Sequence, residues 1–348
     1  MPFKKEGGGK ELVEKEEKEN ETETSGLMIY DEGFVPEWKI RREAANTDEA
    51  TGEKDSASSD QEKAVAQSEE ALPVAVSKTT ERTEYNDAKI EVMIQERILK
   101  DVLNTIRVLG ISEVRINADK DGMGVRQITP DHVALVSLSI PRESLIMYHY
   151  NTMAESIEFA LDVDELYKLI SSYPKNDTLT LSVPIFNQEA QGKLIVQSYN
   201  GTTAEMDLIE KDAISIPRIP DIKVEDYAVM PTKKFRDTMK TIKHFSDVAH
   251  IKFDTETVKI STHTYGDSNI NTETVFTRDD IKEMLVREPG WVEYPVDYLS
   301  QMANGIKSTE FRMTLKKDYP VRIDFELIAE AGGDNIKVTY LLAPRINN

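Results

Sequence analysis

The chain has 348 residues, a formal net charge of -20 and no cysteine. This composition excludes a disulfide framework, a thiolate metal site and a cysteine nucleophile. Its acidity argues against wholesale coating of nucleic acid or anionic membrane, although a local basic surface remains possible. No run approaches the apolar length of a membrane span and the N-terminus lacks a signal-peptide core, so a soluble intracellular protein is the default expectation.

The N-terminal stretch, residues 1–84, is predicted to be a disordered acidic extension. It is rich in Glu, Lys, Ser, Thr and Ala and poor in apolar residues, so it cannot bury enough surface to offset its ordering entropy. One island, GLMIYDEGFVPEWKIRREA (26–44), carries apolar and aromatic residues. This island is either a docking motif, which folds on a partner or on the chain's own body, or a sticky patch in a flexible tail.

The folded body begins near Tyr85 and alternates helical and strand-like patterns in chain order. Helical spacing is predicted over LKDVLNTI (99–106), VDELYKL (163–169), FRDTMKTI (235–242) and VDYLSQM (296–302). Between them, alternating apolar residues with turn signals predict many short strands, as in TLTLSV (178–183) and EFRMTL (310–315). Many strands and few helices indicate an α+β fold with extended antiparallel sheet.

The body contains an internal repeat. The first and third helices are offset by 136 residues (Leu99 to Phe235), and the second and fourth by 133 (Val163 to Val296). Two matches in the same order at nearly one offset predict two copies of a unit of roughly 120–135 residues. Each copy would contribute two helices and several strands.

The repeated helices are amphipathic, with a basic side opposite the apolar one. The first helix has an apolar stripe that runs from Ile98 to Leu109, and the third has Phe235, Met239 and Ile242 facing inward. Lys100 and Arg236 hold matching positions in the repeat. A lone helix of this kind would most simply be a solvated surface helix. Repetition of the basic side in an acidic chain favours a functional surface.

At this point the residues resemble a family, the sliding clamps of archaea and eukaryotes, or proliferating cell nuclear antigens. The resemblance covers residues 88–346 and none of the N-terminal extension. Its most specific segments are YLLAPRI (340–346) and YPVDYLSQM (294–302), with ITPDHVALVSL (128–138) and MPTKKF (230–235) also similar. Together, in order and at the family's spacing, these segments identify the chain as a member of the archaeal type.

The resemblance implies a two-domain DNA clamp subunit, each domain packing two helices on antiparallel sheets. The implied boundaries are clamp domain 1 at 85–209, an interdomain connecting linker at 210–226 and clamp domain 2 at 227–348. Three subunits would close into a ring with helices lining a hole for duplex DNA. Contact with phosphates there would be independent of sequence. The implied DNA-binding residues of the ring interior are Arg97, Lys100, Arg107, Lys168, Lys233, Arg236, Lys240, Lys243 and His244. The fourth helix departs from the pattern, with Gln301 and Asn304 where the family often has a basic residue.

The resemblance also implies a pocket for client enzymes, which insert a short aromatic-anchored turn beside the interdomain linker. The linker carries two Ile-Pro pairs, and proline limits the conformations of such an exposed connector. The implied pocket residues are Ile128, His132, Val133, Leu135, Ile219, Pro220, Pro320, Leu341, Leu342, Ala343 and Pro344. Plain core packing is the alternative for most of them.

Ring closure in the family pairs edge strands of adjacent subunits, which covers edges otherwise prone to aggregation. The implied segments are TTAEMDLI (202–209) and SNINTETVF (268–276), and Ala204 falls where many eukaryotic clamps carry a large aromatic. The implied interface residues are Ala204, Met206, Leu208, Asn269, Asn271 and Glu273.

No signal for catalysis emerges from the sequence. The DKDG turn (119–122) lacks the distal glutamate of a calcium loop, the five histidines are scattered, and no phosphate-binding glycine loop occurs. We therefore expect neither enzymatic activity, cofactor nor metal. The expected function is that of a homotrimeric processivity factor at the replication fork, in the cytoplasm and associated with the nucleoid. Its expected partners are double-stranded DNA, DNA polymerase, a clamp loader and other clients, with no membrane. The alternatives are a clamp-like paralogue or viral decoy that binds clients without closing a ring, and a hydrolase that uses the acidic clusters.

Overall fold

A computed structural model of the protein describes residues 88–218, 224–262, 270–329 and 333–345. All of them belong to one compact unit, Glu70–Asn348. The predicted disordered extension at 1–84 and its island at 26–44 lie outside the described residues, as do Ile219, Pro220 and Asn269.

The first half of the described chain contains ten strands and two α-helices. In chain order they are β1 (Lys89–Gln95), α2 (Glu96–Arg107), β2 (Glu113–Asp119), β3 (Gly122–Ile128), β4 (Ala134–Pro141), the 3₁₀ turn η2 (Arg142–Ser144), β5 (Met147–Asn151), β6 (Ser156–Asp162), α3 (Val163–Ser172), β7 (Thr178–Phe186), β8 (Glu189–Ala190), β9 (Lys193–Ser198) and β10 (Thr203–Asp207). A second 3₁₀ turn, η3 (Lys211–Ala213), follows.

The second half repeats this order. It consists of β11 (Tyr227–Pro231), α4 (Thr232–Ile242), β12 (Val248–Phe253), β13 (Val258–Thr262), β14 (Glu273–Phe276), β15 (Glu283–Leu285), β16 (Gly290–Pro295), α5 (Val296–Gly305), β17 (Glu310–Thr314), β18 (Val321–Leu327) and β19 (Ile336–Leu342). The α+β fold expected from the sequence is confirmed, with the helices on antiparallel sheets.

The strands form three antiparallel sheets, in which the repeat is visible as strand order. One sheet runs β10-β9-β7-β1-β5, with β8 added beside β7, and another runs β14-β13-β12-β16. The third has nine strands in the order β15-β11-β17-β18-β19-β4-β3-β2-β6. In this nine-stranded sheet, β15, β11, β17, β18 and β19 come from the second repeat, and β4, β3, β2 and β6 come from the first. The sheet is therefore continuous across the two repeats.

The joint inside the chain is the pairing of β19 with β4. Six residue pairs join the two strands, from Lys337 opposite Ser139 to Leu342 opposite Ala134. Tyr340 is fully buried at this joint, and its hydroxyl donates a 2.7 Å hydrogen bond to the carbonyl oxygen of Thr105 in α2. Because this bond spans 235 residues of sequence, it fixes one repeat on the other.

Two helix ends have identifiable local causes. The side chain of Asp162 caps α3 by accepting a 2.8 Å hydrogen bond from the Glu165 N–H. Gly110 follows α2 with φ of +72°, a left-handed conformation that glycine adopts without strain. The apolar stripe of α2 is buried as its spacing predicts, including Val102 and Ile106. None of the described helices is both long and apolar enough to cross a membrane.

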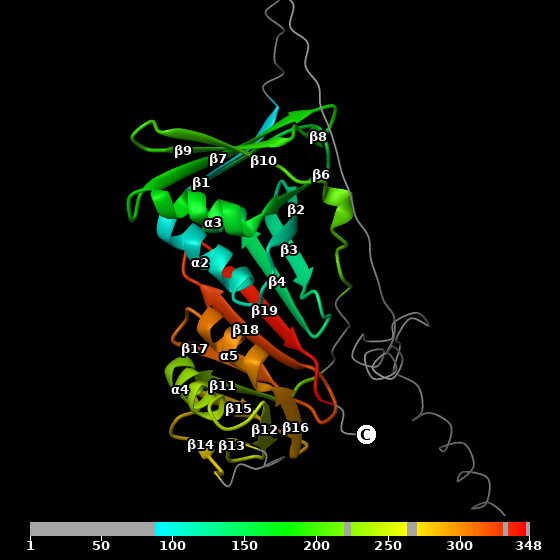
Figure 1. Ribbon diagram of the computed structural model, residues 1–348, viewed down its shortest axis with the longest axis vertical. Coiled ribbons are helices and arrows are strands. Elements are labelled where there is room, and N and C mark those ends of the chain that lie inside the picture. The colour runs from blue at the N-terminus through cyan, green and yellow to red at the C-terminus, as the bar shows by residue number, and fades with distance from the viewer. Residues whose placement is uncertain (1–87, 219–223, 263–269, 330–332, 346–348) are drawn as a thin grey trace, which may run out of the picture. The chain divides into compact units, whose positions relative to one another are not determined.

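The four α-helices follow one another along one side of the sheets (Figure 1). Helix α2 contacts α3 within the first repeat, α4 contacts α5 within the second, and α2 meets α5 across the joint. The buried faces of all four point toward the sheets, so their polar faces form one common surface.

Candidate functional site

The common helix surface carries cations with no hydrogen-bond or ion-pair partner among the described residues. These are Lys168 on α3 and Lys233 and Lys240 on α4, all exposed. These exposed lysines can contact phosphate oxygens without first breaking an ion pair within the chain. Arg97 on α2 and His244, just after α4, are also exposed.

Three other residues predicted to bind DNA are already paired within the chain. The Lys100 ammonium lies 2.9 Å from the buried Glu96 carboxylate, and the Lys243 ammonium lies 2.7 Å from Asp297. The Arg107 guanidinium bonds Asp164 at 2.5 Å and stacks 4.0 Å from the Tyr167 ring centroid. A phosphate would have to compete with these partners for each cation.

Arg236 plays a structural part that the sequence pattern did not reveal. Its guanidinium donates to the carbonyl oxygens of Ala303 at 3.1 Å and Ile306 at 2.8 Å, which lie at the end of α5. Terminal carbonyls of a helix lack intrahelical partners, and a cation also suits the negative end of the helix dipole. The half-buried Arg236 thus fastens α4 to α5.

A second candidate region lies where β3 turns into β4. Ile128 and Val133 are half-buried there, while His132 is exposed and has a left-handed backbone, with φ of 60°. The C-terminal segment runs alongside, because the Ala343 N–H donates to the Val133 carbonyl at 3.0 Å. The structure therefore brings the β3–β4 turn and residues 341–344 together.

The other residues of the predicted client pocket differ in exposure. Ala343, Pro344 and Pro320 are half-buried. Leu135 and Leu341 face each other across β4 and β19 and are each 6% exposed. Leu342 is fully buried in the core. It therefore packs beneath this surface and cannot contact a partner directly.

A hydrogen bond between α5 and the β3–β4 turn was missed by sequence reasoning. The Tyr298 hydroxyl donates to the Asp131 carboxylate at 2.5 Å, across 167 residues. Asp131 also accepts from the Thr129 hydroxyl at 2.7 Å. Burial, and then the bond to Asp131, raise the pKa of Tyr298 to about 12. We refer to the Tyr298–Asp131 bond as the latch.

The described start of the interdomain linker is anchored to the first repeat. Ile209, the residue just before the predicted linker, bridges Ala160 of β6, and Ile214 within the predicted linker is 5% exposed. The Arg115 guanidinium donates to the carbonyl oxygens of Lys211 at 3.3 Å and Ile214 at 3.4 Å, and it also contacts Glu158. This anchor on β2 holds the first part of the linker close to the sheet.

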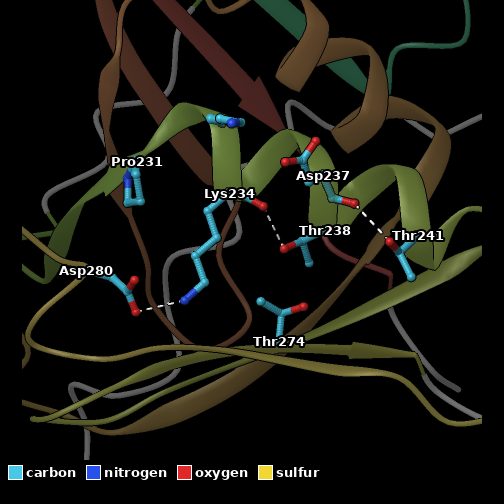
Figure 2. A pocket seen from close by; sticks show the side chains of 8 residues that line it. Pro231, Lys234, Asp237, Thr238, Thr241, Thr274 and Asp280 are labelled. Atoms are coloured by element: carbon cyan, nitrogen blue, oxygen red, sulfur yellow. Dashed lines mark hydrogen bonds and ion pairs between the residues drawn. The ribbon is translucent and has the colours of Figure 1, made fainter.

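The predicted interface segments lie on two open sheet edges. Strand β10 ends one sheet and β14 ends another. On β10, Met206 is buried and Ala204 is half-buried, and Leu208 just beyond the strand is also half-buried, whereas on the β14 side Asn271 and Glu273 are exposed. Beside β14 lies a pocket of about 550 Å³, lined mainly by α4 with Thr274 and Asp280. Figure 2 shows Lys234 reaching Asp280 across it, with Asp237, Thr238 and Thr241 projecting from α4.

Two repeats of two helices on antiparallel sheets, joined edge to edge, define a DNA-clamp subunit as the class of protein. Residues 89–212 match the family described as "Proliferating cell nuclear antigen, N-terminal domain". The DNA polymerase sliding clamp of Thermoplasma acidophilum is 26% identical over 249 residues, which cover 71% of this chain and 94% of that protein. The sliding clamp of Archaeoglobus fulgidus is 28% identical over 266 residues, covering 74% and 99%.

Solved structures agree with these relatives. The structure titled "C-terminal region of FEN-1 bound to A. fulgidus PCNA" has a TM-score of 0.63 and 26% identity, covering 74% of this chain and 99% of that chain. Proliferating cell nuclear antigen from Thermococcus kodakaraensis shares the fold, with a TM-score of 0.64 and 19% identity. The chain is therefore similar to DNA polymerase sliding clamps over its described body, and these similarities support a clamp that acts as a processivity factor.

Proposed function

We propose that this chain forms a closed homotrimeric ring around duplex DNA and tethers DNA polymerase and other clients to the duplex. Tethering raises the effective concentration of a client at its substrate without any new chemistry. The chain itself would be a non-enzymatic partner that acts at the replication fork. The observation that carries the ring is the pair of open edges, β10 and β14, left over by the internal repeat.

The strand registers relate the internal joint to these open edges residue by residue. We align the two repeats at the starts of their helices and follow the paired residues from strand to strand. In this alignment β10 of the first repeat corresponds to β19 of the second, and Thr203 corresponds to Thr339. In the same way β14 occupies the place of β4, so that Glu273 matches Ser137.

Thr339 lies opposite Ser137 in the internal joint. We therefore expect Thr203 of one copy to lie opposite Glu273 of the next. Since each copy offers one edge of each kind, head-to-tail pairing repeats until the ring closes.

In this ring the helix surface would face the duplex. Lys168, Lys233 and Lys240 offer charge to phosphates, and such contacts are independent of sequence and sensitive to salt. For Arg97, Lys100, Arg107, Lys243 and His244 we propose weaker contact, since several of these side chains already have partners in the chain.

For clients we propose the region formed by the β3–β4 turn, the C-terminal segment and the linker. The relative from Archaeoglobus fulgidus has been solved with the C-terminal region of FEN-1, so peptides of that kind are the natural probe. The adjacent Ala343–Val133 backbone bond and the anchored linker start would give such a peptide a preformed surface. The decoy alternative is not favoured, because the relatives are sliding clamps.

Disulfide crosslinking tests the ring, because the chain has no cysteine of its own. We expect Thr203→Cys combined with Glu273→Cys to give a covalently closed species on mild oxidation, at three times the 39.4 kDa chain mass. Thr203→Cys with Val275→Cys shifts the pairing by two residues and serves as the control. When oxidised in the presence of circular plasmid, the ring should stay on the DNA in high salt and leave after the plasmid is linearised. Crosslinking to dimers alone, or equal retention on linear DNA, would contradict the proposal.

A further inference from the structure

The residues packed at the internal joint have equivalents at the open edges β10 and β14, but several of these equivalents differ in polarity or size. In the internal joint, α2 and β4 present Ile98, Val102 and Leu138, all buried. The matching residues on α4 and β14 are Lys234, Thr238 and Thr274, which line the pocket of about 550 Å³ (Figure 2). Three positions that are apolar at the internal joint are therefore polar at the pocket.

Strand β10, which would pack against this pocket in the next copy, lacks the aromatic residue that β19 has at the equivalent position. Tyr340 on β19 is 0% exposed and bonds Thr105 at the internal joint. By register its counterpart on β10 is Ala204, which would face the pocket of the next copy near Thr241, the counterpart of Thr105. The internal joint therefore has a ring and a hydroxyl where the joint between copies has a methyl group.

One charge pair of the internal joint, in contrast, has a charged counterpart at the joint between copies. In the internal joint the Lys307 ammonium, just after α5, lies 3.9 Å from Asp101 of α2. Asp237 of α4 matches Asp101, and Lys175 matches Lys307 when counted back from the following strand. Both Lys175 and Asp237 are exposed, and their side chains have no partner among the described residues.

We infer that the pocket between α4 and β14 receives a second copy of this chain through a polar joint, held by Lys175 on Asp237 and left underfilled at Ala204. This inference rests on the proposed ring and specifies how that ring is held. Exposed ion pairs weaken as salt rises, whereas buried apolar contact does not. The joint between copies consequently loosens with salt, while the internal joint persists.

Light scattering across protein concentration, in low and high salt, measures this joint directly. We expect the trimer to require a higher protein concentration in high salt. Lys175→Glu and Asp237→Lys should each weaken association by about threefold or more per joint, and the two changes combined should restore it. Lys120→Glu is the matched control, since this lysine is also exposed but lies in the turn between β2 and β3, on neither edge.

Filling the joint is the complementary test. Ala204→Tyr should strengthen association by about tenfold or more and reduce its salt dependence, because an aromatic ring and hydroxyl replace a methyl group. Thr203→Tyr, on the opposite face of the same strand, should not do so.

A ring that is equally stable in high salt, and indifferent to Lys175→Glu and Ala204→Tyr, would overturn this inference while leaving the ring intact. If instead every variant stays monomeric and the register-matched cysteines do not crosslink, the ring proposal fails as well.

Discussion

Asp131 is a single carboxylate that joins two segments far apart in sequence. It accepts hydrogen bonds from Tyr298 on α5 and Thr129 on its own turn, and so fixes the turn that carries His132 and Val133. Burial acts to raise the pKa of Asp131, but the bonds from Tyr298, Thr129 and the Val133 N–H outweigh it and lower the pKa below the ordinary 3.8.

This lowered pKa gives the latch a defined pH range. A carboxyl whose pKa is lower in the folded state stabilises the fold above its unfolded pKa, and the contribution is lost as pH falls through the folded value. Asp131→Asn should therefore lower the melting temperature near neutral pH, and the difference from wild type should shrink below about pH 4. Thermal melts over this pH range check it, with Asp279→Asn, an exposed aspartate, as the control. If the difference in melting temperature stays constant down to acidic pH, the Asp131 carboxylate does not stabilise the fold through the Tyr298–Asp131 bond.

Residue-level pattern reading succeeded where spacing along one element decides the outcome. The apolar stripe of α2 is buried as predicted, because helical periodicity depends on local sequence alone. It did not predict the hydrogen-bond partners of Arg236 and Tyr298. The partners of these residues come from α5 and from the β3–β4 turn, 67 and 167 residues away, and no local pattern places those segments beside them.

At the scale of elements, the joint between repeats depends on one close approach of a helix to a strand. Gly305 ends α5 directly beside Tyr340, and a Cβ atom built on Gly305 would lie 2.2 Å from the tyrosine hydroxyl. The glycine is therefore required for space, not for its backbone angles. Its presence lets the ring of Tyr340 reach Thr105 of α2.

Substitution of this glycine should loosen the joint. Gly305→Ala would displace the Tyr340 hydroxyl and its hydrogen bond, with an expected loss of about 1–3 kcal/mol in the free energy of unfolding. Tyr340→Phe removes the atom in closest conflict, so the double variant should be more stable than the sum of the single effects predicts. Chemical denaturation of the four proteins measures this coupling. Strict additivity would show that the two residues do not interact.

The sequence predicted all four long helices within a few residues, and the repeat predicted their pairing into two similar units. It did not predict that β19 would pair with β4, because strand partners are chosen by tertiary packing across the whole chain. The pairing becomes evident only when both registers are known. The open edges at β10 and β14 can then be compared with it.

At the scale of the whole molecule, an acidic chain carries exposed lysines on its helix surface. Replacement of Lys168, Lys233 and Lys240 by alanine should weaken binding to linear duplex in low salt. It should also flatten the slope of log affinity against log salt by about one for each phosphate that the variant no longer neutralises. Binding titrations at several salt concentrations check this.

Arg236→Ala provides the contrasting variant. Since its guanidinium bonds two carbonyls of the neighbouring helix, we expect a lower melting temperature and little change in the salt slope. An unchanged slope in the triple lysine variant would mean that the helix surface does not meet DNA.

The nine-stranded sheet has a mechanical consequence for such a ring. Backbone hydrogen bonds run without interruption from one repeat to the other, and Tyr340 braces that crossing from the helix side. The crossing is thus a stiff element, while the edges at β10 and β14 would meet through a more compliant one. If a force bends the proposed ring, we expect the strain to collect at these more compliant joints while each subunit moves as a rigid segment.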